Sequence, residues 1–175
     1  LNTYNMTNKT AQNDKTLCEG ELVELESSVS GDYTHLRRWM LPTLLEVFQA
    51  NKHNEYPQKI FDAGTVFLLN PSTEMGTEER QMLGVAVSEG AANYTMIRQV
   101  LDYLLLNLGI EKDKIEIKEM EHPSFIPGRV GKILISKKEV GYIGEVHPQV
   151  LSNFQLEMPV GAFELDLNMI SEIVK

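Results

Sequence analysis

Four histidines and several acidic side chains near predicted strand ends are the residues best suited to chemistry. The histidines are His35, His53, His122 and His147. They lack the i, i+4 spacing with which a helix presents two ligands to zinc, so the sequence predicts no metal site. The segment EVHPQV allows Glu145 and His147 to act as an acid–base pair. We favour the alternative, in which backbone groups at proline turns hold both side chains.

Patterns for binding phosphate or nucleic acid are weak. Residues 84–92, GVAVSEGAA, lack the glycine spacing and the Lys-Ser/Thr ending of a phosphate loop. Residues 111–122, EKDKIEIKEMEH, mix charges along an amphipathic strand, which we interpret as a solvated face. The net charge of −9 opposes a dominant phosphate-binding surface, although a local basic patch is compatible with it.

The composition favours one domain with a hydrophobic core. The chain has 175 residues, of which 42% are hydrophobic. Cys18 is the only cysteine, which excludes an intrachain disulfide and suits a reducing compartment. No apolar run approaches the roughly 20 residues that cross a bilayer. We predict a single domain over residues 1–175, located in the cytoplasm and not in a membrane.

Strand and helix patterns alternate along the chain and would position these side chains. Helices are predicted over 41–54, where Pro42 suits the first turn, and over 93–109, where Gly109 suits the left-handed C-terminal position. A short helix is expected at 147–154. Strands are predicted over 1–9, 20–28, 55–70, 81–88, 114–120, 130–136, 140–146 and 160–167. The close hairpins favour an α+β fold, a mostly antiparallel sheet backed by helices.

Four segments together carry a family resemblance: SGDYTHLRRWMLPTLLEVFQANKHNEYPQKIFDAGTVF, HPSFIPGR, GYIGEVHPQVL and FELDL. In order and spacing they resemble the C-terminal, synthetase-like domain of the phenylalanyl-tRNA synthetase beta subunit, in its archaeal and eukaryotic form. The resemblance implies a class II aminoacyl-tRNA synthetase-like fold. It also implies a catalytically silent domain paired with a catalytic alpha subunit. ATP and magnesium are then expected for the whole synthetase, and no cofactor for this domain.

The hairpin over residues 55–88 departs from the catalytic pattern of the class. In catalytic members its first strand ends in Phe-Arg-x-Glu, and the arginine holds the α-phosphate of ATP. The comparable place here reads FLLN, so Leu68 and Asn70 replace the arginine and the glutamate. A leucine side chain cannot donate a hydrogen bond to a phosphate.

A second catalytic signature is also altered. Catalytic members carry a sequence close to Gly-x-Gly-x-x-Arg, which resembles FELDLNMI at residues 163–170. Glu164 and Asp166 stand in place of the glycines, and Met169 lies near the expected arginine. Carboxylates at these places would repel a triphosphate. The resemblance therefore predicts a degenerate nucleotide site.

Acidic residues could instead line a relic pocket, and the candidates are Asp62, Glu145, Glu164 and Asp166. For Asp62 we favour a structural role, accepting backbone hydrogen bonds beside a bulge at Gly64. Arg129 follows a Pro-Gly turn and could pair with an acid such as Glu145 or with a partner subunit.

Two places are candidates for a protein interface. The N-terminal strand contains Tyr4 and Met6, and no helix that could cover it precedes Leu1 in this sequence. We expect a fragment of a longer chain, whose bare strand invites pairing. Arg37 and Trp39 are residue types favoured at binding hot spots, although Arg37 could equally be a charge on a helix surface.

Two functions follow. The first is a non-catalytic core domain of a phenylalanine–tRNA ligase, which supports the alpha subunit and helps to seat the tRNA through the complex. The second is a stand-alone synthetase paralogue that binds an amino acid or a nucleotide as an enzyme or regulator.

Overall fold

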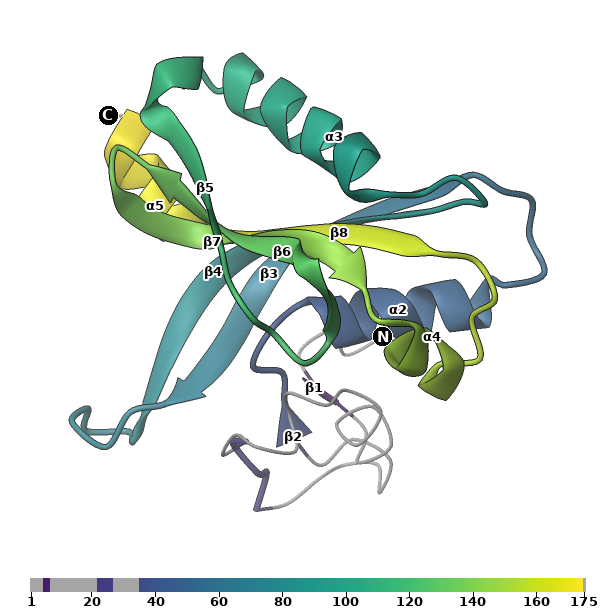
Figure 1. Cartoon of the computed structure of the whole chain (residues 1–175). Helices are drawn as coiled ribbons and strands as arrows, with labels where there is room; N and C mark the ends of the chain where they lie inside the picture. The colour runs from purple at the N-terminus through teal and green to yellow at the C-terminus, as the bar shows by residue number, and fades with distance from the viewer. Residues whose placement is uncertain (1–4, 7–21, 27–34, 175) are drawn as a thin grey trace.

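A six-stranded antiparallel sheet forms the centre of the computed structural model, which describes residues 5–6, 22–26 and 35–174 (Figure 1). The strands lie side by side in the order β3-β4-β8-β7-β6-β5. Their bounds are β3 Gln58–Leu69, β4 Thr77–Ser88, β5 Ile115–Glu119, β6 Phe125–Ile135, β7 Lys138–Val146 and β8 Val160–Asp166. The strand that comes last in the chain, β8, therefore lies in the middle of the sheet.

Helices cover both faces of the sheet (Figure 1). Helices α2 (Leu41–Ala50) and α4 (Pro148–Asn153) pack on one face, and α3 (Tyr94–Asn107) and α5 (Leu167–Val174) pack on the other. A short 3-10 helix, η1 (Lys112–Lys114), leads from α3 to β5. The predicted antiparallel sheet with flanking helices is confirmed.

Helix α2 starts where the sequence predicts. Pro42 lies in its first turn, where the missing N–H would have no helical partner. Leu44, Leu45 and Phe48 are buried on one side of the helix, which matches the i, i+3, i+4, i+7 pattern. The helix ends at Ala50, earlier than the predicted limit of Asn54, and turns occupy the intervening residues.

Helix α3 is bounded by two residues with local roles. The side chain of Asn93 accepts a hydrogen bond from the Met96 N–H at 3.0 Å and caps the first turn. Gly109 has φ +77°, the left-handed conformation that glycine adopts most easily after a helix. The helix buries Ile97, Leu101 and Leu105 against the sheet. The apolar spacing of this helix also predicts Leu108 on the buried side, and that prediction is wrong, because Leu108 is 38% exposed at the C-cap, beyond the last full turn.

Two hairpins set the registers of the sheet. Strands β3 and β4 pair without interruption along their whole lengths, so the bulge predicted at Gly64 is wrong; Gly64 pairs regularly with Met82. Between β6 and β7, Ser136 and Lys137 both have positive φ, at 51° and 66°, as a tight turn between antiparallel strands requires. This second hairpin was predicted, although β6 begins earlier, at Phe125.

The N-terminal part forms a separate small sheet. Strand β1 (Asn5–Met6) pairs with β2 (His35–Leu36), and neither joins the six-stranded sheet. Of the strand predicted over 20–28, the described residues show a bridge between Glu24 and His35. Tyr4 and the side chain of Met6 lie outside the described residues. Among the helices that the structure describes, none has the length and apolar character needed to cross a bilayer.

Candidate functional site

A row of side chains crosses the sheet on the face that α2 covers. Asp62 pairs with Gly84, Gly84 with Glu164, and Glu164 with Tyr142. Directly opposed residues of antiparallel strands point to the same face, so these four positions share one surface. Two of the four predicted relic-pocket residues, Asp62 and Glu164, are thereby brought to the same side of the sheet.

Glu164 binds the start of α2. Its Oε1 accepts hydrogen bonds from the Met40 and Leu41 N–H groups at 2.7 and 2.5 Å, and the residue is 1% exposed. The first N–H groups of a helix have no partner within the helix and lie at the positive end of its dipole, so a carboxylate suits them. A Cβ at Gly84 would lie 2.6 Å from Met40 Cβ, so only glycine lets this end of α2 approach the sheet so closely.

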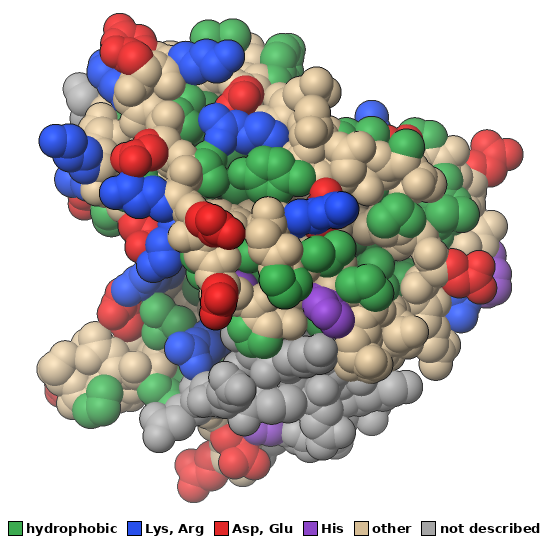
Figure 2. All heavy atoms as spheres, in the orientation of Figure 1, with side chains coloured by type: hydrophobic (Ala, Val, Ile, Leu, Met, Phe, Trp, Pro, Cys, Tyr) green, Lys and Arg blue, Asp and Glu red, His purple; other side chains and the backbone are tan. Residues whose placement is uncertain are grey.

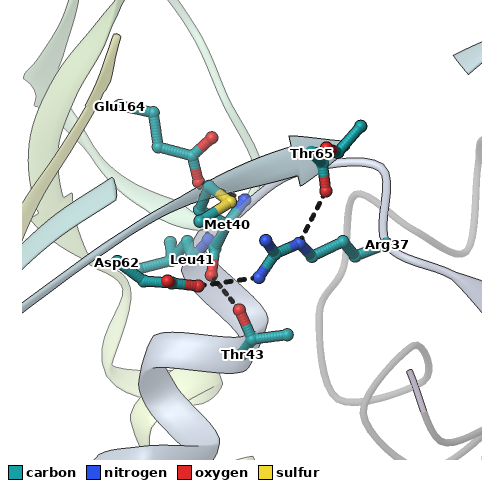
Figure 3. Close-up of polar contacts among 7 residues, drawn as sticks. All are labelled: Arg37, Met40, Leu41, Thr43, Asp62, Thr65 and Glu164. Atoms are coloured by element: carbon teal, nitrogen blue, oxygen red, sulfur yellow. Dashed lines mark hydrogen bonds and ion pairs between the residues drawn. The ribbon is translucent and has the colours of Figure 1, made fainter. Parts of the chain in front are cut away.

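Arg37 is buried beside this helix end (Figure 3). Its Nη1 lies 2.8 Å from Asp62 Oδ2, and its Nε donates to the Thr65 carbonyl at 2.9 Å. A side chain at Gly64 would collide with the guanidinium group, so the glycine supplies its space. Asp62 thus has a structural role, but its partner is a buried arginine and not the backbone.

The predicted contact surface at Arg37 and Trp39 needs correction. Arg37 is 0% exposed and Trp39 8% exposed, so neither side chain is available on the surface of the chain, and Arg37 is not a helix-surface charge either. Both residue types are common at interfaces, but here the segment before α2 folds inward. The arginine then requires an internal acid, and Asp62 provides it.

Aromatic rings fill the sheet face next to this row. Trp39, His122, Phe125 and Tyr142 form a cluster with ring centroids 5.0 to 6.3 Å apart. Burial lowers the pKa of His122 to about 4, because charging the imidazole would cost its hydration. His122 is therefore a neutral packing residue at pH 7. The sequence suggested no role for it beyond a proline turn.

Glu145 lies on the opposite face of the sheet from Glu164. One carboxylate oxygen accepts from the Tyr94 N–H at the start of α3, at 2.6 Å, and the other pairs with Arg129 at 2.6 Å. The ion pair matches one of the two alternatives for Arg129. His147 is held separately, because its Nδ1 accepts from the Gln149 N–H at 3.0 Å and caps α4. The favoured interpretation, in which backbone groups at proline turns hold both side chains, is confirmed for His147 and only in part for Glu145, which a distant backbone N–H and the Arg129 side chain hold together.

Asp166 has a third capping role. Its Oδ1 accepts from the Met169 N–H at 3.0 Å in the first turn of α5. Glu164, Glu145 and Asp166 therefore each bind the start of a different helix. The four carboxylates do not surround one cavity, and sequence reasoning missed the capping by Glu164 and Glu145. The partners of Glu164 are more than 120 residues away, so no local pattern could have revealed them.

The positions predicted to be degenerate have ordinary structural surroundings. Leu68 is partly buried and pairs with Glu78 across the hairpin. Asn70 organises the turn, because its Oδ1 accepts from the Ser72 N–H and its Nδ2 donates to Glu78. Met169 packs against the core on the α3 face. Within the described ranges, no group of three or more His, Cys, Asp or Glu side chains could hold a metal ion.

Comparison with known sequences gives the family. A family model described as the phenylalanyl tRNA synthetase beta chain CLM domain matches residues 1–167. Phenylalanine–tRNA ligase beta subunits from Pyrococcus furiosus and Thermococcus sibiricus are 46% and 45% identical, each over 94% of this chain. That of Methanopyrus kandleri is 36% identical over 85% of the chain. The chain spans only 29% of the length of the first two relatives.

Comparison with solved structures supports the fold. A pyrrolysyl tRNA synthetase from Desulfitobacterium hafniense superposes with a TM-score of 0.74, covering 96% of this chain and 57% of the other, at 14% identity. The predicted class II synthetase-like fold is confirmed by this likeness, which at such identity concerns the fold alone. The sequence matches lead to a more specific statement: the chain belongs to the family of the phenylalanyl tRNA synthetase beta chain CLM domain.

Proposed function

We propose that this chain is a non-catalytic core domain of a phenylalanine–tRNA ligase beta subunit. In this role it supports assembly with the catalytic alpha subunit, and through that complex the attachment of phenylalanine to tRNA. ATP and magnesium act in the whole ligase, in the cytoplasm, and not on this domain. Leu68, Asn70 and Met169 are the positions where the catalytic groups of the class are replaced.

The observation that carries the proposal is the contact between Glu164 and the start of α2. In the interior, the Glu164 Oε1 atom accepts hydrogen bonds from two backbone N–H groups, with N···O distances of 2.7 and 2.5 Å. A bound nucleotide needs donors and positive charge for its phosphates. The N-terminus of α2, however, already has an acid of the chain itself as its acceptor. The buried cationic side chain beside this helix start, Arg37, is paired with Asp62 and so is not available to a phosphate either.

Calorimetry with Mg-ATP tests the non-catalytic role. The isolated chain should give no binding heat at about millimolar nucleotide, and the alpha subunit under the same conditions is the positive control. A dissociation constant below about 100 μM for this chain would contradict the proposal and favour the stand-alone ligand-binding paralogue.

Co-expression tests the assembly role. A full-length beta subunit should co-purify with alpha, and substitution of the N-terminal strand, Tyr4→Lys with Met6→Asp, should weaken the complex if that strand lies at the interface. If this variant co-purifies one-to-one and charges tRNA at the wild-type rate, the interface lies elsewhere. If the wild-type subunits do not associate, the assembly role is wrong.

A further inference from the structure

The outer half of the β3–β4 hairpin extends beyond the sheet. Strand β8 pairs with β4 only between Met82 and Ser88, so residues 65–69 and 77–81 pair with no third strand of the sheet. The base of this part is held by Arg37, because its Nε donates to the Thr65 carbonyl and its own carbonyl accepts from the Phe67 N–H, both at 2.9 Å. Figure 1 shows this part projecting away from the body of the molecule, at the lower left. We name residues 65–81 the arm. Beyond this base the arm is a two-stranded ribbon, which is marginally stable in water without a further packing surface, so its outer part gains from a partner.

The tip of the arm is already ordered by its own hydrogen bonds. The Asn70 N–H donates to the Gly76 carbonyl at 2.9 Å, and the Gly76 N–H donates to the Thr73 carbonyl at 3.0 Å. The single hydrogen of the Thr73 hydroxyl is available to the carbonyls of Asn70 and Thr77, which lie 3.0 and 2.9 Å from the hydroxyl oxygen. A preorganised loop loses little conformational entropy on binding, which favours recognition.

Exposed apolar and acidic side chains meet on this arm. Met75 is 84% exposed and Leu69 41% exposed, and Figure 2 shows apolar side chains on the surface of the lobe at the lower left. The arm contains three glutamates, one arginine and no lysine. Glu78 pairs with Arg80 at 2.7 Å, which leaves Glu74 and Glu79, both exposed, as the net negative charge.

This chemistry selects the kind of partner. An RNA backbone is repelled by glutamates, and binding it would require lysine or arginine, which the arm does not offer in excess. A second copy of a chain with net charge −9 is disfavoured for the same reason. The matching partner is a protein surface with an apolar socket surrounded by basic side chains. The socket would receive the Met75 and Leu69 side chains, and the basic side chains would pair with Glu74 and Glu79.

We propose that the arm docks through Met75, Leu69 and its exposed glutamates on such a basic, socket-like surface of the alpha subunit. This inference rests on the proposed function, in which alpha is the partner of this domain. The arm then contributes to assembly of the ligase, whereas the corresponding hairpin of a catalytic domain would bind the nucleotide.

The test uses full-length beta subunit and alpha, with the dissociation constant of the complex as the readout. Met75→Asp and the double variant Glu74→Lys with Glu79→Lys should each weaken association about tenfold or more, since both remove complementarity. The matched controls are Leu106→Asp, which replaces a 68% exposed leucine on α3, and Glu116→Lys on β5. Both controls should remain within about twofold of wild type. Thermal unfolding checks that each variant is folded.

Three results would overturn the inference. The first is an alpha affinity of the arm variants equal to that of the controls. The second is tighter tRNA binding by the lysine variant with alpha affinity unchanged, which would identify the arm as an RNA contact. The third is absence of any complex with wild-type beta, which removes the proposed function as well. The first two leave the proposed function intact, so the two failures are distinguishable.

Discussion

The two faces of the central sheet are covered by helices in different ways. Under α3 and α5 the core is almost entirely aliphatic, with Ile97, Leu101, Ile133 and Ile143 at 0% exposure. Under α2 and α4 the core contains aromatic rings, and buried charges lie beside it at Arg37 and Glu164. Apolar packing depends mainly on area and volume, whereas hydrogen bonds to a buried charge fix position and direction. The α2 face therefore carries two buried charged side chains, Arg37 and Glu164, whereas the α3 face carries one, Glu145, which binds the start of α3.

The largest effect should come from the aliphatic face. Leu101→Ala should lower the free energy of unfolding by about 2 to 5 kcal/mol, because it leaves a cavity in a well-packed core. Leu104→Ala should cost less, since Leu104 is only partly buried. Urea titration measures both, with the exposed Leu106→Ala as control. A change below about 0.5 kcal/mol for Leu101→Ala would contradict the packing described for α3.

On the α2 face, Glu164→Ala should lower the free energy of unfolding by about 2 to 3 kcal/mol, because two N–H groups lose their acceptor in the interior. Glu164→Gln, which keeps one acceptor oxygen, should lose less. Glu157→Ala on the surface is the control for loss of an acid. Equal stability of Glu164→Ala and wild type in urea would show that the carboxylate does not hold α2.

The aromatic cluster should make stability depend on pH. The pKa of His122 is lowered from 6.5 to about 4, so between these values the unfolded chain binds the proton more readily. The contribution of neutral His122 is complete above pH 6.5 and is lost as the pH falls toward 4. After allowance for partial exposure, we expect a loss of about 1 to 2 kcal/mol.

Urea titrations of wild type and His122→Phe at pH 7.5 and pH 5 measure this dependence. The phenylalanine variant should lose less stability than wild type between the two pH values, because it has no imidazole to protonate. Parallel losses in the two proteins would assign the pH dependence to other groups.

The smallest effect is expected at the partly exposed ion pair on the α3 face. The Arg129 side chain is 57% exposed, so Arg129→Ala should change the free energy of unfolding by about 0.5 kcal/mol. Glu145→Ala should cost more, because the Tyr94 N–H also loses its acceptor. If the two substitutions cost the same in urea, the helix-capping role of Glu145 is minor.

The sequence predicts helices and hairpins well where periodicity and local turn residues are strong. The i, i+3, i+4 spacing of leucines predicts α2 and α3, and the short gap between the strands predicted over 130–136 and 140–146 predicts the β6–β7 hairpin, whose turn lies at Ser136 and Lys137. The inward position of Arg37 and Trp39 was not predictable in this way. A buried arginine depends on an acid from another strand and on the space above Gly64, and both are set by tertiary packing. For the same reason the sequence predicts Glu164 as a pocket residue, whereas in the structure it accepts hydrogen bonds from the first N–H groups of α2.

The place of β8 has a consequence for synthesis of the chain. The β3–β4 hairpin and the β5–β6–β7 meander are made first, and the strand that joins them comes only at Val160–Asp166. Until β8 leaves the ribosome, β4 and β7 each present an unpaired edge, and such edges are prone to aggregate. Completion of the sheet also requires pairing between segments far apart in sequence, which slows folding. A nascent chain of this domain therefore passes through a stage with two separate half-sheets, and this is the stage at which a chaperone would have the most surface to protect.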